Sequence, residues 1–547
     1  MSAEDLLRAA IARAAVDLGA PADFAAHLER PRDPSFGDWA SNAPMALAKV
    51  LRRKPLDIAH DLVARLDVAA AGVREAYVAP PGFLNFRMAA GAEAARLGDV
   101  IAAGATYGRT TEGQGAPANV EFVSANPTGP LHVGHGRQAA LGDAVAALLE
   151  ATGWRVSREF YYNDAGVQIA NLALSVQARV RELGGAPLEI PEGGYHGEYI
   201  RDIARDYVAA HPDDAHGANL EQVRMFAVAA LRHEQDLDLQ AFGVNFDVYY
   251  LESSLYAEGK VDETVALLQA AGHTFEKDGA LWLRTTDYGD DKDRVMRKSD
   301  GTYTYFLPDV AYHVTKWRRG FHRAINVQGA DHHSTVTRVR AGLQALDMGI
   351  PAGYPEYELH QMVTVMRGGE EVKISKRAGS YVTVRDLIDE VGRDAVRYFF
   401  LMRKSESPLV FDVELARSQS EENPVYYIQM AHARLCGIFR VGEVDASTVT
   451  GAGVDYALLN SDDERELVKA LLGYPALVTT AARSRAPHLV ASYLLDTARL
   501  VHTWYHKHHV LGEPDAIRAA RLTLVRAALV VLRNGLEVLG ITAPERM

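Results

Sequence analysis

The sequence predicts a multidomain chain with α/β and all-α parts: a small N-terminal α+β unit, a central parallel-sheet α/β domain with an insertion, and a C-terminal all-helical bundle. The chain has 547 residues, which at roughly 100 to 200 residues per domain corresponds to three or four units. A strand pattern, a tight loop and a helix pattern follow one another between residues 119 and 151. After residue 424 helical periods dominate.

The N-terminal unit is expected over residues 1–110. It opens with an alanine-rich helical pattern and continues to a strand-like segment, Gly82 to Phe86. Residues 104–117 contain four glycines and lack apolar periodicity, so they are typical of a linker. A second domain therefore begins near residue 118.

The central domain, residues 118–405, is predicted to be Rossmann-like. Val120 to Val123 forms the first strand, and the helix from Gly136 to Ala151 has leucines and valine at apolar spacing. Further strands are expected at 323–327 and 359–365, with a helix at 337–346 between them. Residues of about 160–300 interrupt the pattern and are treated as an insertion.

The C-terminal domain, residues 406–547, is predicted to be a helical bundle. Its helical periods run from Pro424 to Leu539 and are broken by a loop rich in glycine and aspartate at 442–463. No strand pattern of comparable strength occurs there.

Composition limits the class of protein. Hydrophobic residues make up 48% and charged residues 24% of the chain, close to the averages for globular proteins. Neither a long apolar run nor an apolar leader is evident. Cys436 is the only cysteine, which excludes internal disulfides and cysteine-rich zinc sites. We expect a cytoplasmic protein without a membrane segment and without a resident metal site.

The formal net charge of −13 argues against a protein that coats nucleic acid indiscriminately. Local basic clusters are either RNA contacts or ordinary solvated faces. The candidates are Arg52, Arg53 and Lys54; Lys316, Arg318 and Arg319; and Arg338 with Arg340.

A phosphate-binding motif is expected where the loop turns into the helix, at Pro130-Leu-His-Val-Gly-His-Gly136. A helix N-terminus presents unpaired N–H groups and a partial positive charge. His132 and His135 would add side-chain donors, and Gly134 would let a base or ribose approach the backbone. A purely structural cap is the alternative, and metal ligation lacks a third ligand motif.

A second candidate motif, Lys373-Ile-Ser-Lys376, lies about 240 residues downstream on a glycine-flanked loop. Two lysines three residues apart can neutralise charge as pyrophosphate departs. A solvated basic loop is the alternative for this segment alone, but the two motifs together are much rarer than either one.

These motifs resemble the two signatures of the class I aminoacyl-tRNA synthetases. Ile374 and Arg377 depart from the common second signature, but both lysines are kept. The resemblance becomes specific to bacterial-type arginyl-tRNA synthetases in four segments and spans essentially the whole chain. The segments are 121–132, 161–166, 423–429 and 543–547.

The resemblance implies an arginine-tRNA ligase that uses ATP with Mg²⁺, L-arginine and tRNA(Arg). Catalysis would come from His132, His135, Lys373 and Lys376, which aim donors and positive charge at the phosphates. Gly329, Asp331 and His332 follow the predicted strand at 323–327, at the edge where open α/β sheets bind ligands. The expected ATP-binding set is His132, Gly134, His135, Gly329, Asp331, His332 and Lys376.

A cationic amino acid is also favoured by Glu121, because a carboxylate within an apolar strand requires a cation. Asp309, with Tyr305 one helical turn before it, could complete a guanidinium site. The alternative is a helix start with an ordinary acid. The family's arginine pocket maps onto Glu121, Asn126, Tyr305, Asp309 and Gln328.

Contact with tRNA is expected on the C-terminal bundle, where aromatic, amide and guanidinium groups cluster on one predicted helix. At helical spacing half of them face the core. The candidates are Tyr426, Tyr427, Gln429 and Arg434. The resemblance implies that the N-terminal unit also contacts tRNA, and a monomer is the expected state.

Three other functions remain open at this point. They are another class I synthetase, a small-molecule nucleotidyltransferase, and a synthetase-like tRNA-binding protein without catalysis. A nucleotidyltransferase needs neither the helical bundle nor the N-terminal unit. The intact histidines and lysines disfavour the non-catalytic protein.

Overall fold

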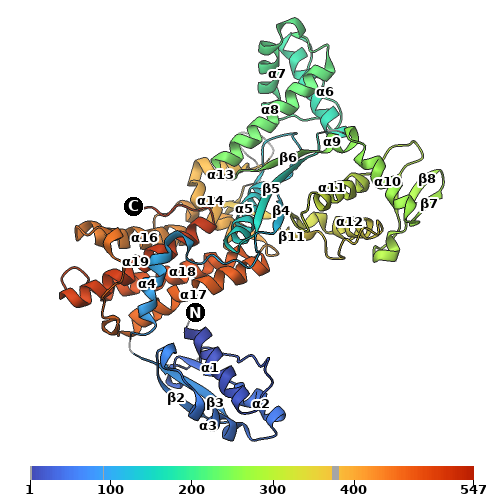
Figure 1. Ribbon diagram of the computed structural model, residues 1–547. Coiled ribbons are helices and arrows are strands. Elements are labelled where there is room, and N and C mark those ends of the chain that lie inside the picture. Colours follow the sequence, from blue (N-terminus) through green and yellow to red (C-terminus); the bar gives the residue numbers. More distant parts are fainter. Residues whose placement is uncertain (1–2, 32, 90, 165, 373–380) are drawn as a thin grey trace.

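The computed structural model describes residues 3–31, 33–89, 91–164, 166–372 and 381–547. The N-terminal unit lies at the bottom of Figure 1, the parallel sheet at the centre beside the orange and red bundle, and a green helical insert projects at the top. This arrangement confirms the predicted combination of α+β, α/β and all-α parts. No helix in the described ranges is long and apolar enough to cross a membrane.

The N-terminal unit has its own hydrophobic core, which ends at Met88. Three helices pack on an antiparallel sheet of strand order β1-β3-β2. The helices are α1 (Ala3–Asp17), α2 (Ala43–Leu51) and α3 (Pro55–Arg65), and the strands are β1 (Trp39–Ser41), β2 (Val73–Ala79) and β3 (Phe83–Met88). The next helix, α4 (Leu97–Ala103), packs against the C-terminal bundle instead.

The central sheet has five parallel strands in the order β11-β10-β4-β5-β6. Its strands are β4 (Pro117–Glu121), β5 (Arg155–Tyr162), β6 (Val248–Leu251), β10 (Arg323–Gly329) and β11 (Glu356–His360). Helix α5 (Val133–Ala151) connects β4 to β5, and its predicted apolar face is buried. Because the chain places later strands on both sides of β4, the border between β4 and β10 is a topological switch point, where such sheets bind ligands.

Two predicted strands differ in extent from the observed ones. The first strand ends at Glu121, because Val123 and Ser124 adopt positive φ angles of 67° and 41°, a conformation outside any strand. The predicted strand at 359–365 is two strands. β11 ends at His360, and β12 (Val363–Arg367) joins a second sheet with β13 (Glu370–Glu371) and β14 (Leu409–Asp412).

The interval of about 160–300 contains two inserts separated by β6. The first is the green helical insert, with a core of its own: α6 (Val167–Leu183), α7 (Glu198–Ala210) and α8 (Leu220–Ala241). The second comprises α9 (Glu252–Ala257), α10 (Lys260–Ala270) and the sheet β7-β8-β9 (Thr274–Lys277, Ala280–Leu283, Arg294–Arg297). Helix α11 (Phe306–Arg318) packs against α10 and α12 (His333–Gln344).

The C-terminal bundle shares one continuous hydrophobic core with the central sheet and α5. Three short helices, α13 (Val384–Val391), α14 (Arg393–Leu401) and α15 (Val413–Arg417), lead into it. The bundle itself comprises α16 (Pro424–Val441), α17 (Asp462–Ser484), α18 (Pro487–Lys507) and α19 (Asp515–Val538). The predicted loop at 442–463 separates α16 from α17.

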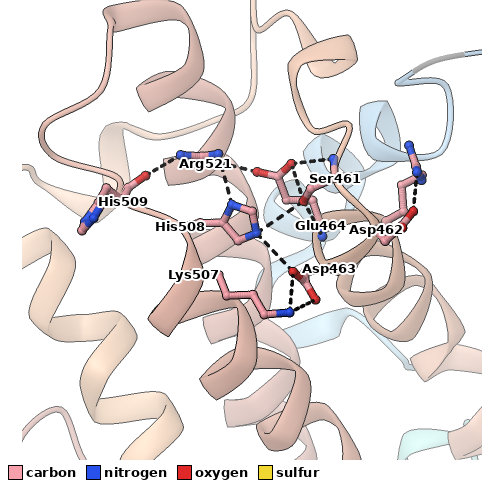
Figure 2. A network of polar contacts seen from close by, with 9 residues as sticks. Ser461, Asp462, Asp463, Glu464, Lys507, His508, His509 and Arg521 are labelled. Carbon is pink, nitrogen blue, oxygen red and sulfur yellow. Dashed lines mark hydrogen bonds and ion pairs between the residues drawn. The ribbon is translucent and has the colours of Figure 1, made fainter.

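A polar network fixes three of the bundle's helix ends to one another (Figure 2). Ser461 caps α17, and the buried Glu464 completes this capping box. Arg521 of α19 donates to Glu464 at 2.9 Å, and Lys507 of α18 donates to Asp463 at 3.1 Å. Because an unpaired buried charge is costly, the buried pair of Glu464 and Arg521 holds the ends of α17 and α19 in register, while the pair of Lys507 and Asp463 is exposed.

Candidate active site

The N-terminus of α5 carries both predicted histidines. His132 is the N-cap residue, and its Nδ1 accepts hydrogen bonds from the backbone N–H groups of Gly134 (3.0 Å) and His135 (3.2 Å). His135 Nδ1 accepts in turn from the His132 N–H at 3.4 Å. The two rings stack with centroids 3.6 Å apart. The histidines therefore form a reciprocal capping box, in which each neutral ring keeps its proton on Nε2.

Both rings are held neutral at physiological pH. Burial lowers the pKa of His132, and burial together with the neighbouring His132 and His360 places the pKa of His135 well below its ordinary value. Each histidine thus offers an Nε2–H donor without being protonated. These donors add to the partial positive charge of the helix N-terminus, which favours phosphate.

Gly134 is required by the histidine pair itself. A Cβ at this position would lie 2.8 Å from the ring of His132. The sequence analysis expected this glycine to leave room for a base or ribose; in the structure it leaves room for the capping ring and also lines the cavity described below. Gly136, one residue after the second histidine, faces Val384 and Phe400 at 2.7 and 2.9 Å from its virtual Cβ, so it serves close packing.

A cavity of about 890 Å³ lies in front of the α5 N-terminus. Its volume falls in the range of small-molecule sites. It joins the helix end to the residues that follow β10, at the predicted switch point. The predicted residues His132, Gly134, His135, Gly329, Asp331 and His332 all line it.

Lys373 and Lys376 lie outside the described residues. The described residues on both sides of them, Glu371 and Val372 before and Tyr381 and Val382 after, line the same cavity. Val133 N–H donates to the Val382 carbonyl at 3.1 Å, and Val384 N–H donates to the Leu131 carbonyl at 2.9 Å. The described residues on both sides of the lysine motif thus line the same cavity as the histidine motif, although the two motifs are far apart in sequence.

His360 lines this cavity and was missed by the sequence analysis. It is buried at the carboxyl end of β11, and burial lowers its pKa to about 4. Its Nδ1 hydrogen-bonds the Gln361 carbonyl at 3.0 Å, while its Nε2 has no hydrogen-bond partner among the described residues. His360 therefore offers an acceptor in the cavity.

Glu121 is paired within the chain. The Lys316 ammonium lies 2.6 Å from its carboxylate and is 0% exposed. The expectation that Glu121 requires a cation is met by this lysine. The structure also corrects the basic cluster at 316–319, because Lys316 is buried and Arg319 forms two hydrogen bonds of 2.8 Å with Glu159.

Asp309 lies in the first turn of α11, with Tyr305 at the N-cap one turn earlier, as predicted. Tyr305 is 68% exposed. Burial, together with the carboxylates of Glu252 and Glu121 and against a lowering by Arg338, raises the pKa of Asp309 to about 7. Asp309 is therefore not an ordinary acid at a helix start.

Glu252 is a further site residue that the sequence analysis missed. It is buried in the first position of α9, directly after β6, and accepts a 2.9 Å hydrogen bond from the Tyr161 hydroxyl. Burial also raises its pKa. Two neighbouring carboxyl groups with raised pKa values form a site that a cation would stabilise. Recognition of β6 as a strand would have pointed to it.

Asn126 lies in the loop that follows β4, and Gln328 lies next to the last residue of β10. The Asn126 amide donates to Gln168 in α6. Gln328 lies near the end of β10, and its side-chain oxygen is buried with no partner within the described ranges. Both amides lie where the parallel strands end.

The predicted tRNA contacts on α16 are largely engaged inside the protein. Gln429 donates to Asp394 (2.9 Å) and to the Thr542 carbonyl (3.0 Å). The ring of His502 lies 4.2 Å from the ring of Tyr427 and bonds Arg434 at 2.8 Å. Tyr426 lines a separate cavity beside α14.

A groove of about 640 Å³ opens on the same helix and includes Arg434. Three guanidinium groups and an aromatic ring line it: Arg434, Arg440, Arg546 and Tyr505. Tyr505 is 39% exposed, and the Arg434 guanidinium lies 5.8 Å from its ring. The sequence analysis did not include Tyr505, Arg440 or Arg546.

Family models match the chain in three consecutive parts. The arginyl tRNA synthetase N terminal domain matches residues 2–88, the catalytic domain of tRNA synthetases class I (R) matches residues 99–411, and the DALR anticodon binding domain matches residues 428–547. The first break between the matches lies between β3 and α4, and the second lies between β14 and α16.

Curated relatives are similar over nearly the whole chain. A protein of Geotalea daltonii named arginine–tRNA ligase is 56% identical over 530 residues, 95% of this chain and 94% of that protein. One of Methylibium petroleiphilum with the same name is 54% identical over 562 residues, covering both chains fully. The solved structure of Thermus thermophilus arginyl-tRNA synthetase superposes with a TM-score of 0.76 at 26% identity, covering 99% and 100% of the two chains.

Proposed function

The chain belongs to the arginyl-tRNA synthetase family, and from that premise we propose that it loads arginine onto tRNA(Arg), with the α5 cavity as its ATP site. One observation carries the site assignment. Two histidines at a helix N-terminus, each with its Nδ1 engaged in capping, line a cavity that is also lined by the residues bracketing the lysine motif. Such an arrangement suits a triphosphate.

In the first step the α-carboxylate of arginine attacks the α-phosphorus of ATP. A bond forms between the carboxylate oxygen and phosphorus, the α–β phosphoanhydride bond breaks, and pyrophosphate leaves. His132 and His135 donate to the phosphate oxygens as charge develops, and Lys373 and Lys376 neutralise the departing pyrophosphate. Asp331 accepts from the ribose hydroxyls beside Gly329 and His332, and His360 Nε2 is free to accept from the base.

Mg²⁺ is proposed to enter with the ATP phosphates. Within the described ranges no three His, Cys, Asp or Glu side chains are placed to hold a metal. Mg²⁺ is commonly held by substrate phosphates and one or two carboxylates. Asp331 and Glu371 line the cavity and are the carboxylates that would hold the ion together with the phosphates. The ion would supply charge neutralisation on the phosphates.

Selection of arginine is assigned to the acidic pocket at α11. Asp309 and Glu252 receive the guanidinium, and the Tyr305 phenol lies one turn away. A planar guanidinium matches two carboxylates better than an ammonium does. Glu121, already paired with Lys316, contributes its field rather than a direct contact, while the amides of Asn126 and Gln328 meet the polar end of the amino acid.

In the second step the 2′ hydroxyl of the terminal adenosine attacks the adenylate carbonyl, and AMP leaves. The groove on α16 is proposed to hold anticodon bases, because Tyr505 offers a stacking face beside Arg434, Arg440 and Arg546. Tyr426, Tyr427 and Gln429 support this helix. The N-terminal unit is proposed as a second tRNA contact.

A monomer in the cytoplasm is proposed as the working state. The sheet and bundle share one core, so one chain completes the site. The single cysteine suits a reducing compartment. The functional units are proposed as residues 1–110, 118–405 and 406–547, with the small sheet of β12 and β14 spanning the second boundary.

Incorporation of labelled pyrophosphate into ATP tests this function. It is measured with each amino acid in turn, with and without tRNA. Exchange that depends on arginine and tRNA is expected. Exchange with a different amino acid would overturn the acidic pocket, and no exchange under any condition would leave a non-catalytic tRNA-binding protein.

A further inference from the structure

The loop between β4 and α5, residues 126–130, is held by side chains from outside the sheet. Gln235 of α8 donates to the carbonyls of Asn126 (3.1 Å) and Gly129 (2.8 Å). The Tyr199 hydroxyl of α7 donates to the Thr128 carbonyl at 2.9 Å. Two helices of the first insert therefore grip the loop that leads directly into His132.

Gln235 is suited to this contact by its primary amide. The side chain is 1% exposed, and its nitrogen has two N–H groups that serve two carbonyls. Its oxygen has no hydrogen-bond partner among the residues the structure describes. The two N–H groups are thus the part of the Gln235 side chain that contacts the loop. Without them, two carbonyls would lose their partner in a buried setting, which is costly.

Gly129 shows how closely the loop is held. A Cβ at this position would lie 2.9 Å from the Tyr381 hydroxyl and 3.1 Å from the Tyr199 hydroxyl. Tyr381 donates to the Pro130 carbonyl at 3.0 Å. The loop is therefore clamped between the insert on one side and the segment after the lysine motif on the other.

The insert is itself anchored to the catalytic helix. Figure 1 shows α8 running from the insert back to the centre of the molecule. At its end the Phe242 carbonyl accepts from Arg397, which is fully buried. The same guanidinium bonds Asp143 of α5 at 2.6 Å and the Leu539 carbonyl after α19 at 2.8 Å. The insert that holds the loop is therefore fixed relative to α5, the helix that follows the loop.

We propose that Gln235 and Tyr199 are positioning residues, through which the α6–α8 insert sets the geometry of Asn126 and His132. This inference rests on the proposed function, because it assigns substrate contacts to those two residues. The helical insert then has a role in the chemistry of the central domain. A displacement of about 1 Å at a reacting group costs roughly 10²-fold in rate.

The test compares Gln235→Leu and Tyr199→Phe with the parent chain in arginine-dependent pyrophosphate exchange. Gln240→Leu is the matched control, because Gln240 is an exposed residue on the same helix whose side-chain amide donates to Asp236 of that helix at 2.7 Å. We expect kcat/KM to fall roughly 10- to 100-fold in Gln235→Leu, less in Tyr199→Phe, and not in the control.

The KM for arginine separates positioning from loss of folded protein. A smaller folded fraction lowers kcat but leaves KM unchanged, whereas a displaced Asn126 raises KM. Parent-like kcat and KM in both variants would overturn the inference, and so would a fall in kcat alone with a lowered Tm. Tyr199→Phe retains the ring and so keeps the test decisive if Gln235→Leu fails to fold. Absence of exchange in the parent chain would instead refute the proposed function.

Discussion

The cavity proposed for ATP and the acidic pocket proposed for arginine lie at the same carboxyl edge of the parallel sheet but use opposite chemistry. The proposed ATP cavity is built from neutral donors that are three residues apart on one helix end, His132 and His135. The arginine pocket is built from carboxyl groups that come from separate elements, Glu252 of α9 and Asp309 of α11. A local phosphate site is thus paired with a dispersed cation site, and each should fail in its own way.

The largest effect is expected from Asp309→Asn. Loss of the buried charge that meets the guanidinium should lower kcat/KM for arginine by roughly 10³-fold, or about 4 kcal/mol. The KM for ATP should remain unchanged. Because the folded-state pKa of Asp309 lies above its unfolded value of 3.8, the ionised carboxyl destabilises the fold at neutral pH, so the Tm should not fall. A raised KM for ATP would show that the two sites are not separate.

The next effect is expected from His132→Asn, which separates capping from catalysis. Asparagine retains an N-cap acceptor but lacks the Nε2–H donor, so kcat in pyrophosphate exchange should fall by roughly 10²-fold. His132→Ala removes both and should also lower the Tm. The KM for arginine is the internal control and should stay near the parent value. Equal Tm values for both variants would argue against the capping role.

The third prediction concerns pH: the KM for arginine should change about tenfold between pH 6 and pH 8, because only the acidic pocket titrates in this range. Below pH 7 Asp309 of the free enzyme takes up a proton, because burial and two carboxylates raise its pKa to about 7. A cation binds the ionised form, so the KM for arginine should be about tenfold higher at pH 6 than at pH 8. The histidines, with lowered pKa values, stay neutral over this range. Asp309→Asn should remove the pH dependence of the KM for arginine. If the dependence persists in this variant, a group other than Asp309 causes it.

The smallest effect is expected from Glu252→Gln. One guanidinium partner is lost, but a like charge is also removed from beside Asp309. The KM for arginine at pH 8 should rise less than about tenfold, and the midpoint of its pH dependence should move to lower pH. Titration of the arginine KM across pH measures both. A midpoint that moves upward would contradict the placement of the two carboxyls in one pocket.

The contrast between a site formed by one contiguous motif and a site formed by separate elements also explains what the sequence could predict. The histidine motif is contiguous, so the sequence alone predicted that His132 and His135 lie where a loop turns into a helix. Glu252 could not be found because it depends on β6, a four-residue strand in an interval without clear periodicity. Lys316 was grouped with a surface cluster because a run of charges does not reveal which side of a helix is buried.

One strand boundary was also missed. Residues 359–365 were expected to form one strand, but β11 ends at the polar pair His360-Gln361 and β12 belongs to a different sheet. On α16 the aromatic and polar side chains were visible, but their inward contacts with His502 and Thr542 depend on helices distant in sequence. The three-part fold was predictable because each part has its own periodicity.

The hydrophobic core around α5 determines which domains of this molecule can be removed or exchanged. Helix α5 packs against the sheet on one side and against α17, α18 and α19 on the other, so the bundle is not a removable module, and heating should melt the two together. The N-terminal unit keeps a separate core and contacts the bundle at the ion pair of Lys469 with Asp38, 3.8 Å apart. An engineer could exchange that unit between relatives with little repacking, whereas a transplanted bundle would need the outer surface of α5 to travel with it.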